Sequence, residues 1–298
     1  MKNKRIMSVP AACFIGVVAV CVIGIIIGSF CDFAINEALA NKTDIGTFFA
    51  TYGLYFAYCL FPAAGMCLFK GLSKKGGNYK LLAWVMLIVG YYMAVFYSNN
   101  YFGKHVRELF GYTAGESSPF VSVLCWGFWV VLYAWVPVVC YFLLDDVDPD
   151  KLIAVGAAIL AAGVVSDAVD TWLKEVGSRP RYKYLLTLDD PASEYRNWWQ
   201  MIPNFAGGKD NFKSWPSGHM MIAAMAFSLP MLSDVCKKKS MARNLVCFAL
   251  ACVYIVIYGY NRIHMTNHFL SDVCFGILFT YLIFAVICSA FLKASEKK

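Results

Sequence analysis

Three short polar clusters in the second half of the chain carry side chains that together could bind and cleave a phosphate ester. Such a site needs cations and hydrogen-bond donors for the phosphoryl oxygens, a nucleophile for phosphorus, and an acid for the leaving oxygen. Each cluster lies at the end of a long apolar run, so these runs must bring the clusters together. The clusters are Lys174 with Arg181, then Ser217, Gly218 and His219, and then Arg262, His268 and Asp272.

The second cluster has the residues of a helix start. Ser217 is expected to be the N-cap, and the backbone N–H groups that follow it can bind an anion. Gly218 lets the backbone approach a phosphoryl oxygen closely. His219 is then available to protonate the leaving alkoxide and later to activate water.

The third cluster supplies a nucleophile. His268 and Asp272 are four residues apart and are therefore neighbours on one helical face. The carboxylate can hold one ring nitrogen as N–H, which leaves the other nitrogen free to attack. Three cations are expected to neutralise the phosphoryl oxygens in the transition state, namely Lys174, Arg181 and Arg262.

The composition of the apolar runs predicts an integral membrane protein. The chain is 60% hydrophobic and only 15% charged, whereas soluble domains carry roughly 25% charged residues. We expect an all-α fold, a polytopic bundle of about eight transmembrane helices of roughly 20 residues or more each. The first is interpreted as a retained helix, because its apolar stretch is about twice as long as that of a secretory signal. The expected spans are 9–34, 46–69, 81–101, 119–144, 152–173, 219–235, 244–261 and 268–292.

The basic residues predict the orientation of these helices. Loops on the side of the N-terminus hold fifteen of the 26 basic residues, which makes that side cytoplasmic. Both termini are then cytoplasmic, and the three clusters lie on the extracytoplasmic face of the cell membrane. The net charge of +7 therefore reports topology and lipid headgroups, not nucleic acid. The fifteen are Lys2, Lys4, Arg5, Lys70, Lys74, Lys75, Lys80, Lys151, Lys237, Lys238, Lys239, Arg243, Lys293, Lys297 and Lys298.

Two parts of the chain are expected. Residues 1–150 hold about four leading helices without an assigned role, and residues 151–298 form the catalytic core. A long outer loop at about 182–213 contains Trp198 and Trp199, which suit either an aromatic belt at the membrane interface or a lid. The twelve cysteines show no disulfide framework, and no C-x-x-C pair suggests a metal site.

Taken in order, Lys-x6-Arg, Pro-Ser-Gly-His and Arg-x5-His-x3-Asp resemble the motifs of the type 2 phosphatidic acid phosphatase superfamily. That superfamily includes lipid phosphate phosphatases, bacterial undecaprenyl pyrophosphate phosphatases, glucose-6-phosphatase and the vanadium haloperoxidases. The resemblance covers about residues 150–292 and implies hydrolysis of a lipid phosphate or pyrophosphate without metal or other cofactor. It makes His268 the nucleophile that forms a phosphohistidine, Asp272 its orienting group and His219 the acid and then the base. The phosphate would be bound by Lys174, Arg181, Ser217, Gly218 and Arg262.

The chain departs from the family pattern at two positions. Tyr182 stands where proline is usual, and Asn261 stands where serine is common. Neither change removes a charge or a proton carrier, so activity is expected to survive, although Tyr182 would reshape the mouth of the site. Arg179 lies where many members carry an arginine and is a further candidate for holding phosphate.

Two alternative functions would use parts of the same residue set. A lipid phosphotransferase would use the same phosphohistidine and pass its phosphoryl group to a lipid or sugar hydroxyl. An anion transporter would use Asp167, Asp170 and the cations, and it predicts inverted repeats and interrupted helices near the midplane. The sequence shows no such symmetry, and the polar clusters lie at the ends of the apolar runs. Asp170 is instead expected to pair with Lys174, one turn later. His264 is interpreted as a loop or substrate-side residue, because His268 alone combines the arginine spacing with a carboxylate at i+4.

Overall fold

The structure is a computed structural model of the chain, and it describes residues 5–41, 43–113, 118–144, 148–203 and 210–296. Among the fifteen basic residues that predict the orientation, Lys2, Lys4, Lys297 and Lys298 lie outside the described residues. Residues 204–209 of the expected outer loop lie outside them as well.

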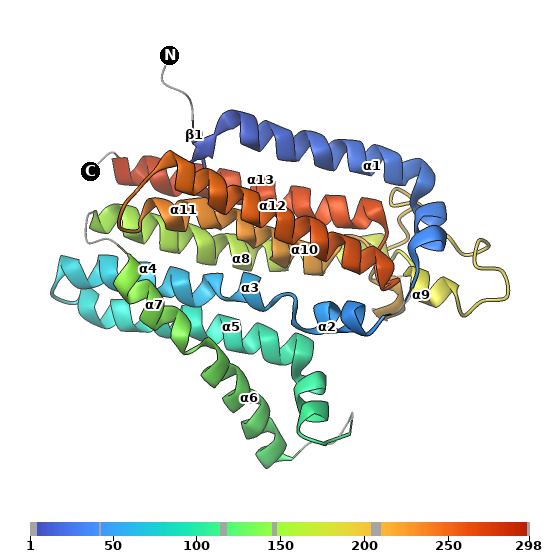
Figure 1. Cartoon of the computed structure of the whole chain (residues 1–298), viewed down its shortest axis with the longest axis horizontal. Coiled ribbons are helices and arrows are strands. Elements are labelled where there is room, and N and C mark those ends of the chain that lie inside the picture. The colour runs from blue at the N-terminus through green and yellow to red at the C-terminus, as the bar shows by residue number, and fades with distance from the viewer. Residues whose placement is uncertain (1–4, 42, 114–117, 145–147, 204–209, 297–298) are drawn as a thin grey trace. The chain divides into compact units, whose positions relative to one another are not determined.

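The all-α prediction is confirmed, since helices make up almost all of the regular structure (Figure 1). Two short strands, β1 (Arg5–Ile6) and β2 (Val9–Pro10), pair antiparallel. The first seven helices are α1 (Ala11–Leu39), α2 (Asp44–Tyr52), α3 (Tyr55–Tyr58), α4 (Leu60–Lys75), α5 (Tyr79–Leu109), α6 (Pro119–Tyr133) and α7 (Trp135–Leu143). Then follow α8 (Pro149–Gly177), α9 (Tyr182–Leu185), η1 (Asp210–Phe212), α10 (Gly218–Ala223), η2 (Ala224–Ser228), α11 (Leu229–Asp234), α12 (Met241–His264) and α13 (Leu270–Glu296).

Seven helical segments of the described chain are long and apolar enough to cross a membrane, which indicates an integral membrane protein. They correspond to seven of the expected spans. The remaining one, 219–235, is divided into α10, η2 and α11. Pro230 stands in the first turn of α11, where a missing N–H is tolerated, whereas it would break a helix that ran through it. The spans are Ala11–Leu39, Ile45–Lys75, Tyr79–Asn100, Pro119–Leu143, Pro149–Leu185, Met241–His264 and Leu270–Leu292.

The chain forms two compact units, each assembled from early and late parts of the sequence. Unit 1 comprises Met1–Gly53, Ala162–Phe227 and Phe248–Ala285, and unit 2 comprises Leu54–Ala161, Ser228–Cys247 and Val286–Lys298. All three polar clusters belong to unit 1. The expected boundary at residue 150 stays a prediction.

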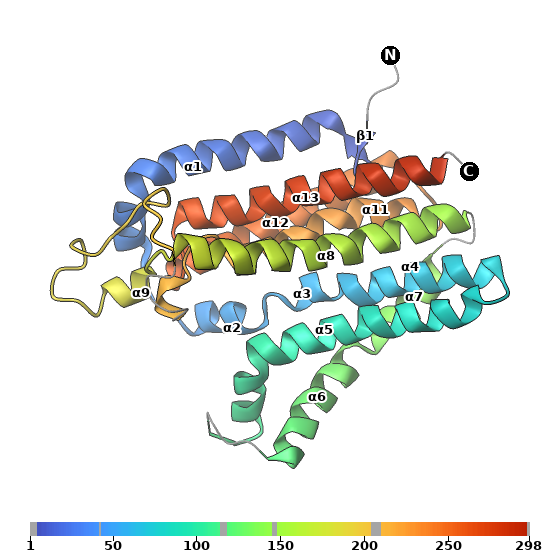
Figure 2. The ribbon, with the colours of Figure 1, turned by 180° about the vertical axis from the view of Figure 1, so that it is seen from behind.

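Within unit 1, helix α1 runs beside α13, as both views show (Figures 1 and 2). Small residues allow this approach. A Cβ on Gly28 would lie 2.8 Å from the backbone nitrogen of Ser271, and Gly24 faces the Cys274 thiol just as closely. Further along, the rings of Phe14 and Tyr281 stack with centroids 4.9 Å apart. The Gly-x-x-x-Gly spacing of Gly24 and Gly28 suits such close packing of membrane helices.

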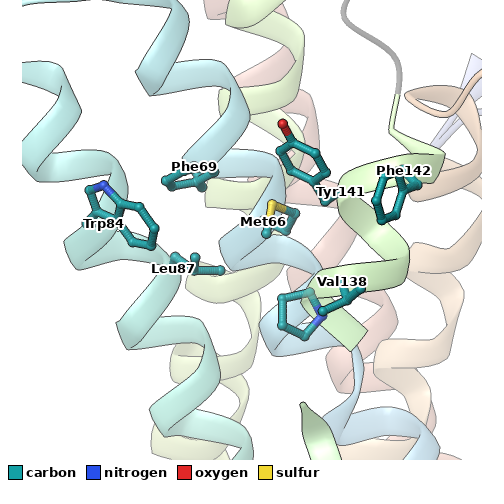
Figure 3. A pocket seen from close by; sticks show the side chains of 8 residues that line it. Met66, Phe69, Trp84, Leu87, Val138, Tyr141 and Phe142 are labelled. Carbon is teal, nitrogen blue, oxygen red and sulfur yellow. The ribbon is translucent and has the colours of Figure 1, made fainter. Parts of the chain in front are cut away.

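Within unit 2, glycines bring α4 and α5 together in the same way. A Cβ on Gly90 would lie 2.5 Å from the carbonyl oxygen of Phe61. Beside this contact, α4, α5 and α7 line an apolar groove of about 400 Å³ (Figure 3). Its lining includes Met66, Trp84 and Tyr141 and presents almost no polar surface, which suits acyl chains.

Candidate active site

Backbone hydrogen bonds tie the three clusters together inside unit 1. Ser214 N donates to Arg179 O at 3.0 Å, which joins the first cluster to the segment before the second. Ser217 N donates to Asp272 O at 3.0 Å, which joins the second to the third. Residues far apart in the sequence therefore lie in one region, because the ends of α8, α10, α12 and α13 meet there.

The two histidines face each other across this region. Their ring centroids are 6.1 Å apart, with the ring planes inclined at 57°. His268 is only 1% exposed. Its Nδ1 lies 2.8 Å from the carbonyl oxygen of Ser214, so Nδ1 carries the proton that this acceptor requires. Its Nε2 is buried and has no hydrogen-bond partner among the described residues, which leaves a lone pair available for attack.

Asp272 acts on His268 through Ser214 and not by the direct bond that the spacing of four suggested. One carboxylate oxygen accepts from the Ser214 hydroxyl at 2.6 Å and from Phe269 N at 2.9 Å. The other accepts from Arg179 at 2.5 Å. Asp272 lies in the first turn of α13, where its side chain binds a backbone N–H, while the His268 ring turns to the Ser214 carbonyl. Ser214 is fully buried and is a site residue that the motifs did not reveal.

The three predicted cations differ in their partners: Lys174 and Arg181 each pair with a carboxylate, and Arg262 binds an amide oxygen. The ammonium of Lys174 lies 2.6 Å from a carboxylate oxygen of Asp170, as the spacing predicted. Arg181 pairs at 2.8 Å with Asp210, an exposed carboxylate of η1. Arg262 donates to the Asn261 side chain at 3.0 Å. The Nε groups of Arg181 and Arg262 are buried and lack a partner among the described residues, so both can still donate to a phosphate.

The start of α10 approaches Lys174 closely. A Cβ on Gly218 would lie 2.5 Å from the ammonium nitrogen of Lys174, so only glycine fits here without displacement. Ser217 is the N-cap, as predicted, and accepts from Met220 N at 3.4 Å. Because α10 has only six residues, most of the positive charge in this region lies on the cationic side chains.

The electrostatic setting keeps His268 neutral. Burial first, and then the charge of Arg181, lower the pKa of the His268 imidazole well below its usual value. Arg262 and Lys174 act in the same direction. His268 precedes the first residue of α13 by two positions and lies outside the seven membrane-crossing segments. A neutral imidazole is the nucleophilic form, so the surroundings favour attack at neutral pH.

Arg179 is a buried cation that binds several residues around the site. It is 2% exposed, and each of its five N–H donors can be matched with a protein acceptor. Its guanidinium also lies 4.2 Å from the centroid of the Phe269 ring. No donor remains for a phosphate, so Arg179 holds other site residues in place. Its acceptors are the carbonyl of Arg196, the hydroxyls of Ser271 and Tyr195, and the carboxylates of Asp272 and Asp32.

The two departures from the family motifs have structural roles. Tyr182 is 3% exposed and packs edge-on against Phe269 and Phe33, so it belongs to a buried aromatic cluster. Asn261 accepts from Arg262 and donates to Gly46 O at 2.9 Å, which steadies the arginine. His264 binds Leu39 O at 2.9 Å through Nδ1, away from the two facing histidines.

All the motif residues lie within one segment that known proteins share. Residues 151–296 match the PAP2 superfamily. The match supports the resemblance drawn from the three motifs at the level of the superfamily. Searches of curated proteins and of solved structures returned no significant match.

Part of the site lies outside the PAP2 segment. Asp32 and Asn36 of α1 contact Arg179 and His268, and sequence reasoning passed over both. Their positions could have been noticed in the sequence, because Asp32 and Asn36 are polar residues inside an apolar span, where such residues are usually functional. Among the described residues, no three His, Cys, Asp or Glu side chains gather as a metal site would require.

Proposed function

We propose that this protein is a membrane phosphatase that hydrolyses a lipid phosphate or lipid pyrophosphate monoester through a phosphohistidine. One observation carries the proposal: the buried Nε2 of His268 has no hydrogen-bond partner among the described residues, while Nδ1 is held by the Ser214 carbonyl. A neutral, oriented imidazole of this kind is a nucleophile for phosphorus. The PAP2 match over residues 151–296 supports the same chemistry.

The reaction then has two steps. In the first, Nε2 of His268 bonds to phosphorus, the bond between phosphorus and the ester oxygen breaks, and His219 gives a proton to the leaving alkoxide. Burial and then the charge of Arg262 lower the pKa of His219 in the free protein, so His219 takes up this proton when the anionic phosphate binds and offsets the cations. In the second, water attacks the phosphohistidine, His219 takes a proton from that water, and the phosphorus–nitrogen bond breaks. Inorganic phosphate leaves and both histidines return to their starting states.

The cations account for the charge that moves during these steps. Lys174, Arg181 and Arg262 each lower the pKa of the His268 imidazole, and their positive charges would stabilise the oxygens of a phosphoryl group at its Nε2. The buried Nε groups of Arg181 and Arg262 add directed donors. We expect no metal to be required for this arrangement.

The membrane setting supports a lipid substrate. A lipid phosphate lies in the same bilayer as the seven apolar helices, with its phosphate at the interface. The outer loop carries Trp198, whose indole N–H donates to Ser29 at 3.0 Å and whose ring lies 4.7 Å from Phe275. Trp199 beside it is 48% exposed. An anchored loop with an exposed aromatic side chain next to the site suits an amphipathic substrate.

We further propose that the termini are cytoplasmic and that the site faces the extracytoplasmic side of the cell membrane. Basic joints gather at one end of unit 2, which supports this orientation. Lys75 pairs with Asp150 and Lys151 with Asp234, each at 2.7 Å, and Lys70 donates to Leu144 O at 3.0 Å.

The test is phosphate release by detergent-purified protein with EDTA present. The panel holds phosphatidic acid, phosphatidylglycerol phosphate, undecaprenyl pyrophosphate, sphingosine phosphate and glucose 6-phosphate. We expect release from at least one lipid and its complete loss in His268→Ala. Retained release in that variant would mean that another group is the nucleophile. Release that EDTA abolishes would contradict metal independence.

A second variant tests the role of His219. His219→Ala should lose far more activity on a lipid phosphate, whose alkoxide is a poor leaving group, than on nitrophenyl phosphate, whose leaving group needs no proton. Equal losses on both substrates would argue against the acid role. If wild-type protein releases no phosphate but transfers it to an added lipid hydroxyl, the protein is a phosphotransferase using the same intermediate.

A further inference from the structure

Helix α1 lies outside the PAP2 segment, yet its single buried stripe faces the residues around His268. Gly28, Asp32 and Asn36 follow one another at intervals of four and are all buried. Asp32 is 1% exposed and Asn36 is 0% exposed. The other face of α1 is apolar and open, with Ile23 and Phe30 at 56% and 84% exposure. A buried carboxylate on this helix therefore calls for a specific partner.

The partners of this stripe are the backbone and side chains of the third cluster. One carboxylate oxygen of Asp32 accepts from Ser271 N at 3.0 Å, and the other accepts from the Ser271 hydroxyl. The side-chain amide of Asn36 donates to the carbonyl of His268 at 3.2 Å. Helix α1 thus binds the backbone at His268, the proposed nucleophile, and at Ser271, three residues later.

Arg179 joins Asp32 to the rest of the site. Its two terminal nitrogens bind Asp32 at 3.0 Å and Asp272 at 2.5 Å, and all three side chains are at most 2% exposed. One cation is therefore shared between two buried carboxylates. Asp272 in turn binds the Ser214 hydroxyl, and the Ser214 carbonyl holds His268 Nδ1. A continuous chain of charged and polar contacts runs from α1 to the nucleophile.

The close packing of α1 on α13 depends on the two glycines Gly24 and Gly28, which have no side chain to keep the helices apart. A Cβ on Gly28 would lie 2.9 Å from the Ser271 Cβ and 2.7 Å from a carboxylate oxygen of Asp32. Gly16, on the same helix, has nothing within 4 Å of such a Cβ. Gly28→Ala and Gly16→Ala are therefore matched changes, of which only the first disturbs the contact.

We infer that α1 is a working part of the active site, in which Asp32 is a positioning residue that acts on His268 through Ser271, Arg179 and Asp272. The inference rests on the proposed function for its kinetic consequence. Asp32 does not touch the phosphate. Its loss should therefore impair the chemical step and leave phosphate binding intact.

The experiment compares wild type, Asp32→Asn, Gly28→Ala and Gly16→Ala as full-length proteins purified in detergent. We expect Asp32→Asn and Gly28→Ala to lower kcat by up to about 100-fold, because a displacement of about 1 Å at a catalytic group can cost that much. The inhibition constant for inorganic phosphate should not change. Gly16→Ala should match wild type. In a protein that already carries Arg179→Gln, Asp32→Asn should lower kcat much less, because the arginine that links Asp32 to Asp272 is already absent.

Hydrogen exchange of peptides covering 264–274 supplies a readout that does not depend on turnover. We expect faster exchange there in Asp32→Asn and Gly28→Ala, and no change elsewhere in unit 1. Wild-type kcat in Asp32→Asn would overturn the inference, as would faster exchange throughout the unit, which marks a merely stabilising role. If wild-type protein has no phosphatase activity, the proposed function fails, while localised exchange still supports the positioning role and unchanged exchange still overturns it.

Discussion

At the scale of single residues, the site depends on keeping His268 neutral beside several cations. The charge of Arg181 is the largest cause, after burial, of the lowered pKa of His268. Removing that charge must raise the pKa, so His268 becomes protonated and unreactive at a higher pH. Arg181→Gln should therefore move the acid limb of the kcat/KM profile to higher pH, in addition to weakening substrate binding.

The measurement is kcat/KM against pH for wild type and Arg181→Gln with one substrate. Using the same phosphate ester in both cancels the contribution of its own second ionisation, which has a pKa of about 6. Lys183→Gln is the control for the acid limb, because Lys183 shares Asp210 with Arg181 but is not among the largest causes of the His268 shift. Lys183 does lower the pKa of His219, so a change confined to the basic limb of Lys183→Gln reports on His219. An acid limb that stays in place in Arg181→Gln would show that this arginine does not control the nucleophile.

The residues found from the sequence are those whose roles depend on local spacing. Lys174, His219 and His268 stand at fixed distances from other motif residues, so a linear pattern can identify them. Ser214 and Asp32 could not be found in this way. Ser214 acts through its backbone carbonyl, which every residue possesses, and Asp32 reaches Ser271 across 239 positions of the chain.

At the scale of elements, the helices were predictable because their apolar runs are long, whereas the division of 219–235 was not. Composition alone does not distinguish an unbroken span from α10, η2 and α11 in succession. The first of these pieces, α10, packs against α13 beside the site. That contact depends on Gly276, where a Cβ would lie 2.5 Å from the carbonyl oxygen of Ser217.

Gly276→Ala should therefore push the N-cap of α10 away from α13. We expect a loss of about 1–3 kcal/mol in stability, typical of overpacking in a tight contact, together with a fall in kcat because Ser217 and His219 shift. Thermal unfolding in detergent and kcat measured on the same preparation test this. Gly16→Ala is the control, since nothing lies within 4 Å of its added Cβ. Wild-type values for Gly276→Ala would mean that α10 and α13 can separate without consequence.

At the scale of the whole molecule, the orientation in the membrane would decide which pool of lipid phosphates the proposed phosphatase meets. Helix α8 begins two residues before Lys151, a basic residue that pairs with Asp234. The last turn of α8 holds Lys174 of the candidate site. With 29 residues, α8 is about 44 Å long, enough to cross a bilayer. The two ends of α8, which carry Lys151 and Lys174, are therefore expected on opposite sides of the membrane.

Epitope tags can test this arrangement without any assay of activity. One tag is placed at the C-terminus, one between Gly76 and Gly77 in the turn joining α4 and α5, and one between Ala192 and Ser193 in the outer loop. Antibody should reach the loop tag on intact cells, and the other two only after permeabilisation, because basic loops stay cytoplasmic. The turn tag and the terminal tag control each other, since both must behave alike. A loop tag that is hidden on intact cells and exposed with the others would place the site on the cytoplasmic side, and the substrate would then be a lipid phosphate of the inner leaflet.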